Sequence, residues 1–200
     1  KEGHIITVNM TASEILPAAP HNPTISFDGV DVDLTAVAGS DTEWEASYTI
    51  PDNTTISEGT IPIILSYKDN ANRSGTPLQV TSDNKTIKFD KTPPNLTAIS
   101  ISSNNSYNSS MAKVGDVITL NFTGSHSLNA SPVVAVLGNA ADDVSQGSDD
   151  TQWSATYTLQ EGDAEGTITF TIDYADLARN DGIQKSQNDI TDGSSITFDK

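Results

Sequence analysis

The sequence has no cysteine, few basic residues and no long apolar run, and each absence limits what the chain can be. Without cysteine, neither a disulfide framework nor a thiolate metal site can form. The 10 Lys and Arg against 27 Asp and Glu give a net charge of −17, which repels nucleic acid and anionic membrane surfaces. No apolar run reaches the roughly 18 residues of a membrane span. We therefore expect no nucleic-acid partner and no membrane insertion.

Residues in catalytic patterns are also scarce. The three histidines, His4, His21 and His126, are not spaced as in the His-Glu-x-x-His helix of metalloproteases. The segment 124–127, Gly-Ser-His-Ser, lacks the flanking glycines of a strained nucleophile turn, and no helix pattern follows it. The acidic pair Glu43 and Glu45 fits the solvent face of a strand better than a glycosidase cleft. We expect no catalytic activity; an enzyme would need a site that no motif reveals.

Four pairs of matching segments show that the sequence is an internal duplication. They are 1–10 with 113–122, 44–50 with 153–159, 67–71 with 174–178, and 89–91 with 198–200, at offsets of 112, 109, 107 and 109. A pitch of about 110 residues is that of a duplicated domain with loops of varying length, because solenoid repeats are only about 20–50 residues long. We predict two domains, residues 1–91 and 92–200.

Apolar residues alternate with polar ones in short runs separated by Gly, Asn, Asp and Pro, and helix patterns are nearly absent. The run at 44–50, Trp-Glu-Ala-Ser-Tyr-Thr-Ile, and its copy at 153–159 both alternate in this way. Half-buried antiparallel strands require such alternation, since successive side chains point to opposite faces of the sheet. Asp28-Gly29 between two such runs predicts a hairpin.

About seven strands in each repeat predict an all-β fold of two tandem immunoglobulin-like β-sandwich domains with antiparallel strands. We interpret Trp44 and Trp153 as central core aromatics, because each lies in an alternating run. The alternative for either tryptophan is an exposed ring that stacks on a sugar.

Three motifs together resemble the immunoglobulin-like tandem repeats of large bacterial surface and secreted proteins of the adhesin type. They are the Trp-x-Ala-x-Tyr strand, the Tyr-x-Asp-x-Ala element, and Phe-Asp-Lys followed by Thr92-Pro93-Pro94. The resemblance covers nearly the whole chain and implies an extracellular location, neighbouring repeats as partners, and in some relatives calcium at the joints. Many relatives have Asp-x-Ala-Gly-Asn, whereas this chain has Asp69-Asn-Ala-Asn-Arg73 and Asp176-Leu-Ala-Arg-Asn180, so a ligand role of that turn does not carry over directly.

The segment between the repeats predicts a short, stiff joint. Adjacent prolines at Pro93 and Pro94 restrict φ and favour extended geometry in the residue before them. Leu96–Ser103 then reads as the first strand of repeat two, alternating Leu96, Ala98 and Ile99 or Ile101 with polar residues. Repeat one has no counterpart, since Lys1 aligns with Lys113. Two interpretations stay open: the chain is cut from a longer array, or another chain's strand fills the edge.

Calcium is the one metal that the composition suits, because hard cations take oxygen ligands from Asp, Asn and backbone carbonyls in loops. The candidate ligands are Asp69 and Asp176, each after a strand-end tyrosine, and Asp90 and Asp199, which end the two repeats. No EF-hand loop is present, and Asp and Asn also stabilise turns through their own backbone. Calcium binding and turn formation are therefore both open for these residues.

The leading functional hypothesis is a non-catalytic module that acts as a rigid spacer or stalk in a bacterial surface or secreted protein, with any export signal outside these residues. The alternative is a binding module for a carbohydrate or a protein, using a sheet face or the tip loops. The loops Ser13–Asn22 and Ser125–Ser131 differ between the repeats, as binding loops do and as loops without a function also do.

Overall fold

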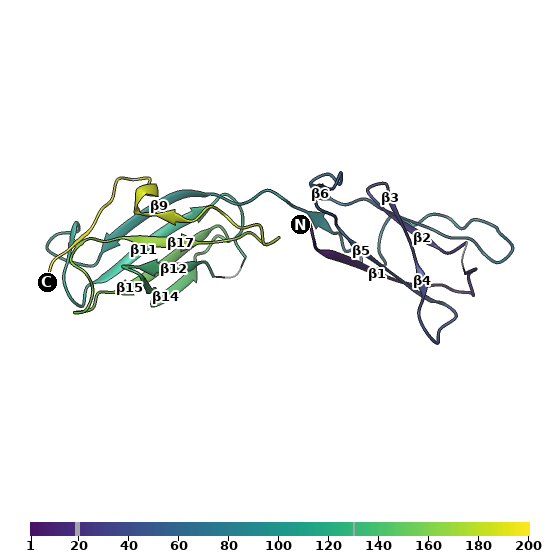
Figure 1. Ribbon diagram of the computed structural model, residues 1–200, viewed down its shortest axis with the longest axis horizontal. Coiled ribbons are helices and arrows are strands. Elements are labelled where there is room, and N and C mark those ends of the chain that lie inside the picture. The colour runs from purple at the N-terminus through teal and green to yellow at the C-terminus, as the bar shows by residue number, and fades with distance from the viewer. Residues whose placement is uncertain (19–20, 130) are drawn as a thin grey trace. The chain divides into compact units, whose positions relative to one another are not determined.

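The computed structural model describes residues 1–18, 21–129 and 131–200, and the chain divides into two compact units, Lys1–Lys91 (unit 1) and Thr92–Lys200 (unit 2). Both units are built from strands, which confirms the predicted all-β class (Figure 1). The only helix in the described ranges is the 3-10 turn η1 (Gln187–Asp189). No helix within those ranges has the length and apolar character to cross a membrane.

Within residues 1–18 and 21–91, unit 1 contains eight strands: β1 (Ile5–Thr11), β2 (Thr24–Phe27), β3 (Val30–Asp33), β4 (Thr35–Ala36), β5 (Glu43–Thr49), β6 (Gly59–Thr60), β7 (Ile63–Ser66) and β8 (Lys88–Phe89). They form the sheets β1-β5-β4 and β3-β2-β7 and the short pair β6-β8. Ile6 and Trp44 from the first sheet and Phe27 and Leu65 from the second are buried in one core. Unit 1 is therefore a sandwich of two small sheets.

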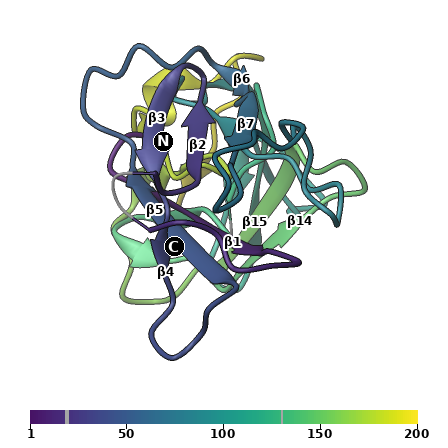
Figure 2. The same cartoon turned by 90° about the vertical axis from the view of Figure 1, so that its right-hand side faces the viewer.

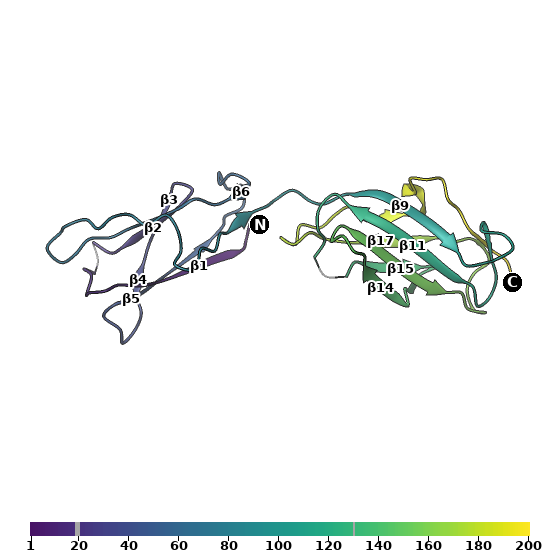
Figure 3. The ribbon, with the colours of Figure 1, turned by 180° about the vertical axis from the view of Figure 1, so that it is seen from behind.

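The described part of unit 2, residues 92–129 and 131–200, contains eleven strands: β9 (Leu96–Ser103), β10 (Met111–Ala112), β11 (Val117–Gly124), β12 (Val133–Val136), β13 (Asn139–Ala140), β14 (Asp143–Gln146), β15 (Gln152–Thr158), β16 (Gly166–Thr167), β17 (Phe170–Asp173), β18 (Lys185–Ser186) and β19 (Thr197–Phe198). The two main sheets are β14-β15-β11-β9, which faces the viewer in Figure 3, and β13-β12-β17-β18. Phe122 and Trp153 of one sheet and Val134 and Ile172 of the other are buried in one core.

The two tryptophans occupy corresponding core positions. Trp44 is 3% exposed and Trp153 is 7% exposed. The interpretation of both as core aromatics is confirmed, and the alternative of an exposed sugar-stacking tryptophan is wrong for both. Glu43 and Glu45, on either side of Trp44, are exposed, as the alternation predicts.

A two-residue turn joins β2 and β3, which lie side by side in Figure 2. Asp28 has φ 48° and Gly29 φ 87°, the left-handed values of a type I′ hairpin, so the hairpin prediction is confirmed. In unit 2, Leu137 and Gly138 form the corresponding turn between β12 and β13, with φ 51° and 83°. A leucine gives no turn signal; its strained backbone is tolerated because the side chain packs against the core.

One strand pair departs from the expected antiparallel arrangement. β10 runs parallel to β19, with Met111 opposite Thr197. After β9 the chain leaves the sheet β14-β15-β11-β9. Its next strand, β10, lies beside β19 and runs in the same direction.

β9 has the predicted bounds. A register shift between β9 and β11 explains why the apolar residues of β9 do not alternate strictly with the polar ones. Ala98 lies opposite Thr123 and Leu96 opposite Gly124 of β11, so Thr97 is an extra residue. The extra residue lets Leu96, Ile99 and Ile101 all point into the core, while Ala98 is exposed. In unit 1 the strand equivalent to β11 is β1; it pairs with β5, and no strand in the described ranges pairs with its other edge.

Candidate functional site

The carboxylate of Asp69 is engaged by its own turn. Its Oδ1 accepts hydrogen bonds from the backbone N–H groups of Ala71 and Arg73, both at 2.9 Å, and its Oδ2 lies 2.8 Å from Nε of Arg73. The Arg73 backbone N–H and the Arg73 guanidinium hold the pKa of Asp69 below its ordinary value. Asn72, at φ 63°, supplies the left-handed residue that closes the turn.

Asp176 takes the corresponding place in unit 2, but it is buried. The residue is 2% exposed, and its two carboxylate oxygens accept hydrogen bonds from the backbone N–H and the Nδ2 of Asn180, both at 2.8 Å. Arg179 at φ 65° fills the left-handed position that Asn72 fills in unit 1. Both aspartates therefore serve as the organising acceptor of a tight loop, as the turn interpretation predicts.

The other two calcium candidates end the last strand of each unit. Asp90 is half-buried and Asp199 is exposed, and the Asp199 N–H donates to the carbonyl of Ala112 at 3.0 Å. Across residues 1–18, 21–129 and 131–200, no three His, Cys, Asp or Glu side chains gather closely enough to share one metal ion. Asp69 and Asp90 belong to unit 1, and Asp176 and Asp199 to unit 2. Calcium binding by these residues stays a hypothesis.

A glutamate anchors the end of each unit, a contact that no sequence motif indicates. The backbone N–H of Lys91 donates to Oε1 of Glu58 at 2.9 Å, and that of Lys200 donates to Oε1 of Glu165 at 3.0 Å. Each glutamate precedes a glycine of left-handed φ, 111° at Gly59 and 112° at Gly166. In the sequence, this contact is marked by nothing more than the matching Glu-Gly pairs at 58–59 and 165–166. The pairs could be interpreted only after the structure showed that Lys91 and Lys200 bind to their glutamates.

The far side of the joint is fixed within unit 2. The N–H of Asn95 donates to Oγ of Ser125 at 3.0 Å, and the N–H of Ser125 donates to the carbonyl of Asn95 at 2.7 Å. Ser125 belongs to one of the two loops that differ between the repeats. Part of that loop therefore holds the start of unit 2 in place through its hydrogen bonds to Asn95. Ala130 of this loop, and Ala19 and Pro20 of the other, lie outside the described residues.

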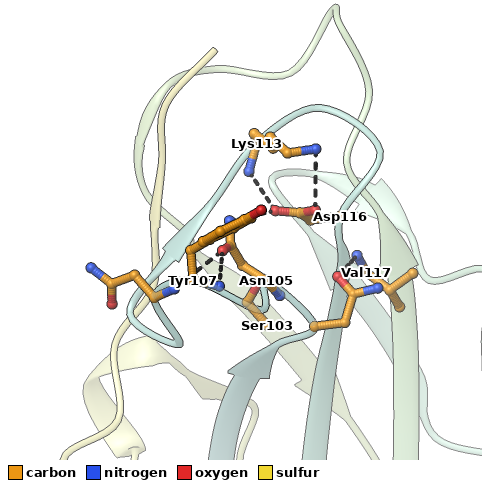
Figure 4. A network of polar contacts seen from close by, with 8 residues as sticks. Ser103, Asn105, Tyr107, Lys113, Asp116 and Val117 are labelled. Carbon is orange, nitrogen blue, oxygen red and sulfur yellow. Dashed lines mark hydrogen bonds and ion pairs between the residues drawn. The ribbon is translucent and has the colours of Figure 1, made fainter.

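The loop 104–110, between β9 and β10, is held by a polar network centred on Asp116 (Figure 4). Asp116 is 9% exposed, and its Oδ2 accepts from Nδ2 of Asn105 at 3.0 Å and from the Lys113 N–H at 2.9 Å. Nζ of Lys113 lies 3.8 Å from the other carboxylate oxygen. Oδ1 of Asn105 in turn accepts from the N–H of Tyr107 at 3.0 Å. The buried aspartate thereby fixes the loop through Asn105.

Tyr107, at the tip of this loop, is 97% exposed. Its backbone N–H donates to Oδ1 of Asn105 (Figure 4), while the residue as a whole stays exposed to solvent. An aromatic ring on a fixed backbone offers a large contact area at little cost in conformational entropy. Sequence reasoning missed this residue because it lies in a run of Asn and Ser that reads as an ordinary loop.

The sequence matches no protein-family model and no curated protein. Among solved structures, SGBP-B of the Bacteroides ovatus mixed-linkage glucan utilization locus, in complex with a mixed-linkage heptasaccharide, is 17% identical over 99% of this chain and 42% of that chain, with a TM-score of 0.25. Dimeric latent PorU from Porphyromonas gingivalis is 10% identical over 97% of this chain and 19% of that chain, with a TM-score of 0.34. BcpA, the major pilin subunit of Bacillus cereus, is 11% identical over 98% of this chain and 69% of that chain, with a TM-score of 0.25. This chain thus spans less than half the length of the first two, and similarities this slight assign no function.

Proposed function

We propose that the chain is a non-catalytic spacer module of an extracellular bacterial protein, in which successive sandwich domains are joined by short, stiff connections. The observation that carries the proposal is the anchoring of the joint. Lys91 is bonded to Glu58 of unit 1, and Asn95 is bonded to Ser125 of unit 2. Between these anchors lie only Thr92, Pro93 and Pro94.

Two properties of the segment would limit its flexibility. Proline fixes φ near −65°, and the second proline also restricts the residue before it, so few backbone conformations are open to Pro93 and Pro94. A linker of this length and composition is a semi-rigid spacer, in contrast to a Gly- and Ser-rich linker, which behaves as a random coil. The duplicated contact of Glu165 with Lys200 is what a module repeated along an array would use at each joint.

The composition supports the extracellular part of the proposal, because a chain rich in Thr, Ser, Asn, Asp and Gly and without cysteine suits the exterior of a bacterium. The net charge of −17 keeps such a protein soluble and its copies apart. Asp69 and Asp176 accept hydrogen bonds from the backbone of their own turns, which gives them a structural role that needs no catalytic activity. On this proposal the function is mechanical: it sets the distance between the domains that flank it.

Small-angle scattering combined with residual dipolar couplings of the two units tests the proposal. The wild type should show a narrow distribution of inter-unit orientations. Replacing Pro93 and Pro94 together by Gly should broaden it, and Glu58→Ala should do the same by releasing Lys91. Glu165→Ala is the matched control, because it removes the same contact away from the joint and should change nothing. A wild type already as mobile as the glycine variant would overturn the spacer proposal.

A second candidate function is binding of a carbohydrate or a protein through the loop 104–110. The specific observation in its favour is Tyr107, which is 97% exposed on a loop fixed by Asp116. An aromatic face surrounded by amide and hydroxyl groups is a surface suited to sugars, since the ring covers apolar C–H groups and the polar side chains bond hydroxyls. A glycan array probed with wild type and with Tyr107→Ala tests it. Ile183→Ala, at another exposed apolar residue (81%), is the control.

A further inference from the structure

The outer face of one sheet in unit 2 is hollowed. A depression of about 340 Å³ lies on the sheet β14-β15-β11-β9, the sheet that faces the viewer in Figure 3. Each of the four strands contributes to its lining, among others through Ser100 of β9, Asn121 of β11, Ser145 of β14 and Ser154 of β15. Ligand sites in proteins have volumes of about 300–1,000 Å³. The hollow is therefore large enough for a small ligand or for part of a larger one.

The strand register places these polar side chains in one row. Ser100 lies opposite Asn121, and Asn121 lies opposite Ser154. Ser154 in turn lies opposite Ser145. Side chains directly opposite on neighbouring strands are about 5 Å apart, so the row crosses the whole sheet. Leu120, next to Asn121 in the chain, is buried in the core, which places the row on the solvent side of the sheet.

A second pair of uncharged polar residues lies beside this row, and the rim next to it is closely packed. Thr123 of β11 lies opposite Gln152 of β15. The N–H of Gly147 donates to the carbonyl of Gln152 at 2.8 Å, and a Cβ on Gly147 would stand 3.1 Å from Cβ of Gln152. Nε2 of Gln146 donates to the carbonyl of Asp150 at 3.1 Å. These contacts and the strand ladders hold the backbone of the lining in place.

The lining of the hollow is uncharged. Among the described residues that form it there is no Asp, Glu, Lys or Arg, in a chain with 10 basic and 27 acidic residues. Unit 1 differs at the equivalent positions: at the repeat offset of 109, Glu43 corresponds to Gln152 and Glu45 to Ser154, and both glutamates are exposed. Asp143, at the start of β14, lies outside the lining. The hollow is thus a neutral surface on an acidic protein.

The polar side chains of the row are open to a ligand. Within the described residues, no hydrogen bond joins the side chain of Ser100, Asn121 or Ser154 to another part of the protein. A hydroxyl both donates and accepts, and a carboxamide offers two donors and an acceptor. Sugar hydroxyls have the same dual character. A row of hydroxyl and amide groups can therefore bond to successive hydroxyls of a glycan.

The same surface suits other ligand classes poorly. The centre of a protein–protein interface is apolar and aromatic, but none of the large apolar side chains that the described residues expose lines the hollow. The net charge of −17 repels nucleic acids and acidic glycans. An uncharged, hydroxyl-rich ligand meets neither obstacle.

We propose that the outer face of the sheet β14-β15-β11-β9 binds an uncharged oligosaccharide, whose hydroxyl groups bond to Ser100, Asn121 and Ser154. Because the row crosses all four strands, the glycan lies across the strand direction. The two aromatic residues of the lining, Phe122 and Trp153, are buried in the core, so the affinity comes from hydrogen bonds and not from stacking on a ring.

This site is separate from the loop 104–110, which follows the end of β9. It adds a binding function to unit 2 and does not depend on the spacer role, which is tested by the orientations of the two units.

The test is a glycan array of uncharged and acidic oligosaccharides probed with the full chain. The wild type should retain uncharged glycans and no acidic ones. Asn121→Ala removes the central group of the row and should weaken binding about 10-fold, the effect of one hydrogen bond left unmade. Asn9→Ala is the matched control, because Asn9 is the equivalent of Asn121 at the offset of 112 and lies in unit 1; it should change nothing.

A second variant fills the hollow. Ser154→Glu introduces the longer side chain that unit 1 carries at Glu45, and it should abolish binding. Dispersed NMR spectra show that each variant is folded; if Ser154→Glu is unfolded, Asn121→Ala decides alone. A wild type that retains no uncharged glycan overturns the proposal, and so does retention that survives both changes. Retention that only Tyr107→Ala abolishes assigns the glycan to the loop 104–110 and overturns this site.

Discussion

Gly182 lies flat against the ring of Tyr174, so that a Cβ on the glycine would stand 2.2 Å from Cε2 of the tyrosine. The N–H of Gly182 donates to the carbonyl of Tyr174 at 2.9 Å. Unit 1 repeats the arrangement with Gly75 and Tyr67, again at 2.2 Å. Neither glycine has a left-handed φ, so the backbone conformation does not require glycine at these positions. Glycine is required because the tyrosine ring leaves no room for a side chain.

Gly182→Ala should destabilise unit 2 by about 1–3 kcal/mol, the usual cost of overpacking. The gain of about 0.4–1 kcal/mol from a less flexible unfolded chain is too small to offset it. Gly75→Ala should cost less, because Tyr67 is only half-buried and its ring can swing away, whereas Tyr174 is 6% exposed. Denaturant unfolding followed separately for each unit measures both; equal costs would contradict the explanation.

Asp176→Ala should destabilise unit 2 by about 1–3 kcal/mol, since it leaves the buried N–H of Asn180 without its acceptor. Asp69→Ala is the matched change in unit 1. It should cost less, because water can replace the lost acceptor in an exposed turn whose Arg73 side chain is 81% exposed. Thermal unfolding of the two variants provides the comparison, and a larger effect of the Asp69 change would contradict it.

Calcium should leave the thermal midpoint unchanged. The oxygens of Asp69 and Asp176 already accept hydrogen bonds from Ala71, Arg73 and Asn180, and a cation would have to displace these donors. Scanning calorimetry in millimolar calcium and then in excess chelator makes the measurement. An upward shift with calcium, lost in Asp176→Asn, would show instead that the turn acids bind the ion.

Unit 2 should lose stability in alkaline solution. Burial, reinforced by the neighbouring Asp163, raises the pKa of Tyr157 above its ordinary value of 10.0, and burial raises the pKa of Tyr174. The folded unit holds these protons more tightly than the unfolded chain, so their contribution is present below pH 10 and disappears as the pH rises through the folded values. Tyr157→Phe should make the fall above pH 10 shallower. An unchanged pH profile would contradict the assignment.

Amide hydrogen exchange should distinguish the free edge of β1 in unit 1 from the corresponding edge of β11 in unit 2, which β9 covers. The amides of Thr7 and Asn9 should exchange rapidly, while those of Thr119 and Asn121, which face β9, should be protected. We also expect unit 1 to be the less stable unit, because no strand of its described residues covers the free edge of β1. Equal protection of the two units would contradict both expectations.

Much of the fold could be predicted because local chemistry dictates it. Alternation in 44–50 and 153–159 placed both tryptophans inside, and Asp28-Gly29 fixed a hairpin. The turn at Leu137 and Gly138 could not be predicted, since leucine is unfavourable at positive φ and is held there by packing. The extra residue Thr97 in β9 was hidden for a similar reason: a bulge is defined only by the opposing strand.

The contacts at the candidate sites also fall into two groups: those within a turn, which the sequence could indicate, and those between distant segments, which it could not. The role of Asp69 and Asp176 as turn acceptors follows from residues within four positions of each, and turn chemistry was one of the two interpretations open from the sequence. The contacts of Glu58 with Lys91 and of Thr191 with Ile99 join residues 33 and 92 positions apart, and no local pattern marks them.

The sequence by itself determined the all-β class, the duplication and the core faces, because strand alternation and turn residues act over a few positions. Only the tertiary structure decided which strand covers which edge and that Asp116 fixes the loop of Tyr107. Those outcomes depend on hydrogen bonds and burial between segments far apart in the chain, and the free energy of such contacts is set by the whole sandwich.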